Sequence, residues 1–174
     1  SHRMYLSTDL YFLTNYPSSI RWFTLFEIWN KRNDEWSGDR AGSCRWNLAL
    51  YKEPGVGQPL YWQVEAERMQ PSSEEYLWKF SNNTIPVPLG KWFTLDVSMK
   101  RGEGNNGRFI IKITVDGVTS TICDVANTTL YPGHPELPVS TFQPFKLYTD
   151  DAVLDWMRAN NKIIAASYNN FIWY

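Results

Sequence analysis

Cysteine and histidine are scarce in this sequence of 174 residues, which has two of each. Two cysteines cannot form a disulfide framework or supply the ligands of a structural zinc site. No apolar run approaches the roughly 20 residues that a membrane-spanning helix needs, so insertion into a bilayer is not expected. The 17 Lys and Arg residues are balanced by 18 Asp and Glu residues and form no cluster, which argues against nucleic acid as a partner.

Aromatic residues, by contrast, are abundant. The sequence contains 9 Trp, 10 Tyr and 9 Phe, which together make up 16% of the chain. A hydrophobic core does not need so many indoles, because each buried indole must also find a partner for its N–H group. The surplus indicates that some of these rings serve a ligand.

Apolar and polar residues alternate over five segments of the chain, which are 22–30, 45–51, 60–66, 91–100 and 108–115. In the first segment, Glu27 and Trp29 share one face, and Phe26 and Ile28 share the other. A period of two that is sustained over so many segments is typical of half-buried antiparallel strands.

Turn and helix signals complete the prediction of the fold. Asp116-Gly117, between two valines, predicts a tight hairpin. Asp150 precedes apolar residues at helical spacing and predicts a short helix that it caps. The aromatic segment 167–174 predicts a closing strand. With no repeat or linker, we predict one domain over residues 1–174, an all-β two-sheet antiparallel sandwich of the jelly-roll type with one short helix.

A set of polar and aromatic side chains remains on the non-core faces of three neighbouring predicted strands. These are Glu27, Trp29, Arg45, Asn47, Tyr51, Tyr61, Gln63 and Glu65. Flat rings can stack on the C–H face of a sugar, and the polar groups beside them can bind vicinal hydroxyls. The set therefore predicts non-catalytic binding of a polysaccharide or oligosaccharide to water-exposed rings on one sheet face. The alternative is that the rings only pack at the rim of the sheet.

Two further tryptophans lie in polar stretches. Trp36, in the segment 33–40, is either an anchor for a lid or a further platform for the ligand. Trp78 lies in a stretch of similar polarity and is interpreted in the same way. His134, in a proline-rich loop, is interpreted as a solvated residue.

Catalysis is the second hypothesis. A glycoside hydrolase needs two carboxyl groups about 5 to 9.5 Å apart, which Glu65 and Glu67, or Glu27 and Glu65, could supply across a strand face. The dense carboxylate triplet of strand-borne glucanase sites is missing, however. A polysaccharide lyase would need a base, for which Tyr61 is the alternative to the two glutamates. If the protein is an enzyme, the predicted catalytic residues are therefore Glu27, Glu65 and Tyr61.

No cofactor or metal is expected, because no histidine, cysteine or acidic cluster has ligand spacing. The alternative that stays open is a structural calcium ion held by loop carboxylates, namely Asp34, Asp39, Asp116 or Asp124. Whether Cys44 and Cys123 pair also stays open. A bond would suit a secreted module, and two thiols would be small buried apolar groups.

The linear order of several segments resembles a known superfamily. They are Tyr5 to Leu10, Leu25 to Asn30, Arg45 to Leu48, Pro88 to Leu95, Gly107 to Phe109 and Phe142 to Thr149. Their order is similar to that of concanavalin A-like lectin/glucanase domains, particularly modules of bacterial polysaccharide-degrading proteins. The resemblance implies the jelly-roll fold, a polysaccharide ligand and other modules of the same polypeptide as partners. It also implies an extracellular, cell-surface or periplasmic location.

The sequence departs from this superfamily in two places. Asn169-Asn170 stands where relatives often have paired aspartates, which weakens a calcium role there. Glu27-Ile28-Trp29 occupies the place of a Gln-Ile-His triplet in the lyase branch, which weakens the lyase alternative. At the other end of the chain, Ser1-His2 is either a tag remnant or a point within a larger secreted protein.

Overall fold

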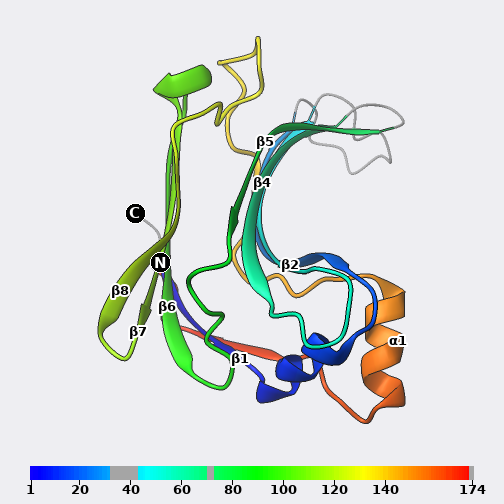
Figure 1. Ribbon diagram of the computed structural model, residues 1–174. Coiled ribbons are helices and arrows are strands. Elements are labelled where there is room, and N and C mark those ends of the chain that lie inside the picture. Colours follow the sequence, from blue (N-terminus) through cyan, green and yellow to red (C-terminus); the bar gives the residue numbers. More distant parts are fainter. Residues whose placement is uncertain (32–42, 70–72, 173–174) are drawn as a thin grey trace.

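Two antiparallel five-stranded sheets face each other in the computed structural model, which describes residues 1–31, 43–69 and 73–172 (Figure 1). The first sheet has the order β10-β1-β6-β7-β8, formed by Ala166–Asn169, His2–Leu6, Trp92–Lys100, Arg108–Val115 and Val118–Val125. The second has the order β5-β4-β3-β2-β9, formed by Glu74–Asn82, Tyr61–Met69, Ser43–Lys52, Ile20–Lys31 and Thr141–Gln143. This arrangement confirms the predicted all-β sandwich.

The core lies between the sheets because each strand turns its apolar set inward. Phe26, Ile28 and Trp46 are buried from the second sheet, and Phe93 and Leu95 are buried from the first. These residues are on the faces that the period of two assigns to the core. The alternating pattern therefore placed both the apolar and the polar face of the second sheet correctly.

The predicted hairpin and helix are also confirmed. Asp116 and Gly117 have φ angles of 51° and 81°, the left-handed pair that a two-residue hairpin turn requires. Helix α1 spans Asp151–Ala159, and the Asp150 side chain accepts a hydrogen bond of 2.8 Å from the Val153 amide. Two 3₁₀ helices, η1 (Thr8–Asn15) and η2 (Gly104–Asn106), complete the described elements.

Two local predictions are wrong, and His2, whose origin stays open, is a buried residue of β1. Trp78 is not in a polar loop but in β5, where it is buried and donates a hydrogen bond of 2.7 Å to the Thr128 carbonyl. The closing strand ends at Asn169 because Asn170 adopts a φ of 51°, which extended backbone cannot continue; residues 173–174 lie outside the described part of the chain.

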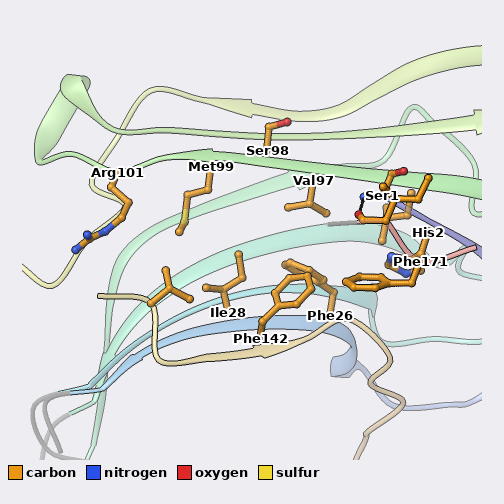
Figure 2. A pocket seen from close by; sticks show the side chains of 13 residues that line it. Ser1, His2, Phe26, Ile28, Val97, Ser98, Met99, Arg101, Phe142 and Phe171 are labelled. Carbon is orange, nitrogen blue, oxygen red and sulfur yellow. Dashed lines mark hydrogen bonds between the residues drawn. The ribbon is translucent and has the colours of Figure 1, made fainter. Parts of the chain in front are cut away.

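A cavity of about 430 Å³ lies inside the sandwich, between β6 of one sheet and β2 and β9 of the other. Figure 2 shows Val97 and Met99 on one side of it and Phe26, Ile28 and Phe142 on the other. Because these side chains belong to the apolar interior, the cavity is separate from the polar face of the second sheet.

Both cysteines are buried as thiols. Cys44 and Cys123 form no disulfide, and burial raises the pKa of each to about 12. The open question of their pairing is thus settled in favour of two separate apolar groups. Among the described residues, no helix has the length and apolar character to cross a membrane.

Candidate functional site

The second sheet is curved, and its hollow side is turned away from the first sheet (Figure 1). Since β2, β3 and β4 place their apolar residues against the first sheet, the intervening residues lie on this concave face. The predicted set on β2, β3 and β4, from Glu27 to Glu65, is therefore gathered on one surface.

One row of polar residues crosses all five strands of this sheet in register. Glu27 lies opposite Gln143 of β9 and Asn47 of β3, Asn47 lies opposite Glu65 of β4, and Glu65 lies opposite Lys79 of β5. Strands spaced about 4.8 Å apart give this transverse row a length of roughly 19 Å. Such a row offers hydrogen-bonding groups along a line rather than at a point.

Arg45 organises the next row on the same face. Its Nε and Nη2 atoms contact Glu67 Oε2 at 2.6 and 2.5 Å, and its Nη1 contacts Glu27 Oε1 at 3.4 Å. The guanidinium carbon lies 5.4 Å from the centroid of the Trp29 ring. The Trp29 indole in turn donates a hydrogen bond of 2.9 Å to Glu27 Oε2. The guanidinium therefore joins two buried carboxylates and covers the indole.

Two lysines close this network, one at each edge of the sheet. Lys146, just after β9, places its Nζ 2.6 Å from Glu27 Oε1, and Lys79 of β5 places its Nζ 3.2 Å from Glu65 Oε1. Each ammonium also lies over an exposed phenol ring, at 5.1 Å for Tyr148 and 3.3 Å for Tyr76. The polar row is thus flanked at both ends by a tyrosine that reaches solvent.

Tyr51 and Tyr61 both donate their hydroxyl hydrogens to carboxylates. Tyr51 donates to Glu65 Oε1 at 2.8 Å, and Tyr61 donates to Glu53 Oε1 at 3.1 Å. Burial and the neighbouring carboxylates raise the pKa of Tyr51 far above its ordinary value and that of Tyr61 to about 12. Both phenols therefore keep their protons at neutral pH.

Glu67 is the carboxyl group whose protonation the site perturbs most. Burial raises its pKa to about 7 although Arg45 opposes the shift, and Glu65, two residues away on the same strand face, adds repulsion. The neighbouring carboxylates raise the pKa of Arg45 against the effect of burial. Arg45 therefore stays charged, while Glu67 titrates near neutral pH.

The predicted site residues come together, but not as a water-facing set. Glu27, Asn47, Gln63 and Glu65 are buried in their own hydrogen bonds, and Trp29 is only 8% exposed. The expectation that Trp29 presents an open ring is wrong because Arg45 and the floor of the sheet cover it. The alternation along a strand predicts the face on which a residue lies. It does not predict whether long side chains from other strands cover that residue.

The remaining predicted positions lie elsewhere. Trp36, Asp34 and Asp39 fall outside the described residues. Asp116 pairs with Lys91, and Asp124 pairs with Arg108. Within residues 1–31, 43–69 and 73–172, no three histidine, cysteine or acidic side chains are grouped to hold a metal ion.

Sequence reasoning missed the residues that border the site, namely Tyr76, Lys79, Gln143, Lys146 and Tyr148. Tyr76 and Lys79 escaped because a bulge between Ala66 and Glu67 breaks the simple alternation of β5 against β4. Gln143 and Lys146 become part of the site only because their segment adds to the far edge of β2.

Comparison with known proteins supports the architecture. No protein-family model matches the sequence, and no curated protein matches it. A solved structure of the alginate lyase Aly36B, with two substitutions and in complex with an alginate tetrasaccharide, superposes with a TM-score of 0.51 at 13% identity. The match covers 96% of this chain and 63% of that chain. A second structure of Aly36B gives a TM-score of 0.46 at the same identity and coverage. The first match shows a shared β-sandwich fold.

Proposed function

We propose that this protein binds a polysaccharide along the concave face of the second sheet, as a non-catalytic module of a secreted, cell-surface or periplasmic polypeptide. The observation that carries the proposal is the row from Lys79 through Asn47 to Gln143, in register across five strands. A sugar chain is long and rich in hydroxyl groups, which the partly exposed Lys79 ammonium and Gln143 amide at the two ends of this row can bind, above the buried Glu27, Asn47 and Glu65. The sandwich shared with a lyase whose structure is in complex with an alginate tetrasaccharide is consistent with such a ligand.

Binding fits the face better than catalysis does. Glu27 is fully buried and bound by Lys146, Arg45 and Trp29, so it is not poised to transfer a proton to a ligand. Tyr51 and Tyr61 have raised pKa values, which disfavours either phenol as the base of a lyase.

One observation favours hydrolysis as a second candidate function. The pKa of Glu67, at about 7, is in the range of a general acid. Glu65, two residues earlier on the same face of β4, would be the second carboxyl group that hydrolysis needs. In this alternative, Glu67→Gln would abolish the release of reducing ends without abolishing retention on the polymer.

Affinity electrophoresis through gels that contain one polysaccharide each tests the proposal, with reducing ends and unsaturated products assayed in parallel. Tyr76→Ala and Tyr148→Ala should weaken retention by about fivefold each, since an aromatic contact contributes roughly 1 kcal/mol. Trp92→Ala, which removes an exposed ring from β6 of the opposite sheet, is the matched control and should bind as the wild type does.

Three outcomes decide the matter. Retention without products, weakened by the tyrosine substitutions only, supports the proposal. Product formation that Glu67→Gln removes replaces it with hydrolysis. Retention on no polysaccharide overturns both and leaves a structural sandwich without a sugar ligand.

A further inference from the structure

The charges on the concave face are arranged in two layers. The carboxylates of Glu27, Glu65 and Glu67 form the buried floor, and the cations of Arg45, Lys79 and Lys146 lie above them, partly exposed. The cations are therefore the first charges that a ligand meets. Whether they can bind an anion depends on what already holds them.

Every cation of this upper layer is already engaged by a carboxylate beneath it or beside it. Lys146 and Arg45 share Glu27, Arg45 also binds Glu67, and Lys79 binds Glu65. Glu74 adds a further carboxylate 3.7 Å from Arg45. Among the described side chains of this network, the cations Arg45, Lys79 and Lys146 are matched by the carboxylates of Glu27, Glu65 and Glu74. Glu67, whose pKa burial raises to about 7, adds a partial negative charge, so the network holds a small excess of negative charge and no spare cation.

This imbalance sets a penalty on anionic ligands. A uronate or a sulfate group could gain an ammonium or guanidinium partner only by competing with a buried carboxylate for it. If it won, Glu27 or Glu65 would lose the charge that compensates its burial, which is strongly unfavourable. If it lost, it would lie next to an excess of negative charge.

Hydroxyl groups meet no such penalty. The N–H donors of Lys79 and Lys146 that point away from the carboxylates can donate to a sugar oxygen while the ion pair remains intact. The half-buried Gln143 amide, in register beside Glu27, offers both a donor and an acceptor at the level of the floor. A neutral polyol therefore uses this face without disturbing its charge balance.

We infer that the polysaccharide taken by this face is neutral, a chain of sugars without carboxylate or sulfate groups. The inference rests on the proposed function, since it names the ligand class of the same site. It separates the chain from the alginate-bound lyase that shares its fold, because alginate is a polyuronate. The inferred difference in ligand comes from the way the cations of this face are paired with carboxylates of the protein, and not from the shape of the sheet.

The test compares polymers that share a backbone and differ only in charge. Each neutral polysaccharide that retains the wild-type protein is compared with its C6-oxidised derivative, which carries uronates, at 10 and 300 mM NaCl. The neutral form should bind at least tenfold more tightly at low salt, and the difference should shrink at high salt as charges are screened. Polyuronates such as alginate and polygalacturonate should retain the protein weakly or not at all.

Substitution of a carboxylate in the protein gives a second test of the inference. Glu65→Gln releases Lys79 from its carboxylate and should increase retention on the oxidised polymer several-fold relative to the wild type. Glu74→Gln is the matched control, because it removes the same charge from a half-exposed position 3.7 Å from Arg45 and should change retention less.

The failure of the inference and the failure of the proposed function look different. Tighter binding of the oxidised polymer, strengthened at low salt, overturns the neutral-ligand inference and leaves polysaccharide binding standing. Retention on neither class of polymer overturns the proposed function and the inference with it. Equal retention of both forms at 10 mM NaCl also overturns the inference.

Discussion

The ion pair between Lys146 and Glu27 joins the segment after β9 to the middle of the sheet, and its removal makes a quantitative prediction. Glu27 is 0% exposed, and the Lys146 Nζ is its closest cation at 2.6 Å. The substitution Lys146→Met keeps most of the aliphatic stem and removes the ammonium. Glu27 would then depend on Arg45 at 3.4 Å and on the Trp29 indole at 2.9 Å.

The magnitude follows from the burial of the two partners. Removing one member of a fully buried ion pair costs about 3 to 5 kcal/mol. The Lys146 side chain is 23% exposed and Arg45 still faces Glu27, so the expected loss in the free energy of unfolding is smaller. We expect a loss of about 2 kcal/mol, which lowers Tm by roughly 4 to 8 °C for a chain of this length.

Urea denaturation and thermal unfolding, followed by tryptophan fluorescence, measure this loss. Lys91→Met is the control, because it breaks an exposed ion pair of 2.7 Å with Asp116 and should cost less than about 0.5 kcal/mol. The double variant Glu27→Gln/Lys146→Met should recover part of the loss, since it leaves no uncompensated carboxylate. If Lys146→Met costs no more than Lys91→Met, the argument that Lys146 compensates a buried charge is refuted.

Two further predictions concern protonation. Because burial raises the pKa of Glu67 to about 7 from an ordinary value of 4.5, the folded state binds the proton more tightly than the unfolded chain does. The stability of the wild type relative to Glu67→Gln should therefore be highest below pH 4.5 and fall by at most about 3 kcal/mol as pH rises through 7, in urea titrations at several pH values. Glu74→Gln is the control, and its stability relative to the wild type should lack this fall. Cys44 and Cys123, with pKa values of about 12, should react with a thiol reagent only after unfolding in urea.

Each of these predictions has an outcome that contradicts it. A wild-type stability that rises relative to Glu67→Gln between pH 4.5 and 7 would mean that Arg45 outweighs burial at Glu67. Stoichiometric labelling of either cysteine within minutes under native conditions would mean that its strand opens far more readily than the buried core suggests.

The strands that alternate strictly are those that could be predicted from the sequence. In β2, Glu27 and Trp29 fall on one face and Phe26 and Ile28 on the other, because a strand places successive side chains on opposite sides. The prediction failed at Trp78, which was assigned to a polar stretch although Leu77 precedes it and Phe80 follows two positions later. Its burial depends on the first sheet: the Thr128 carbonyl, which follows β8, accepts its indole hydrogen bond.

The candidate site shows the same division. Arg45, Asn47, Gln63 and Glu65 could be predicted to share a face from their spacing alone. The charge compensation of the buried Glu27 and Glu65 could not, because it depends on Lys146 and Lys79, which reach them from the two edges of the sheet. Neither lysine lies within ten residues of the carboxylate that it binds, so no local pattern connects them.

The sequence by itself determined the antiparallel sandwich, the capped helix and the chemical character of one sheet face, because these depend on periodicity and on neighbours along the chain. The tertiary structure alone decided the register of the five strands, and with it which charges compensate one another. Strand pairing brings together residues as far apart as Glu27 and Lys146, and the low polarity of a buried floor makes their partnership strong. The electrostatic character of the concave face is therefore a property of the assembled sheet.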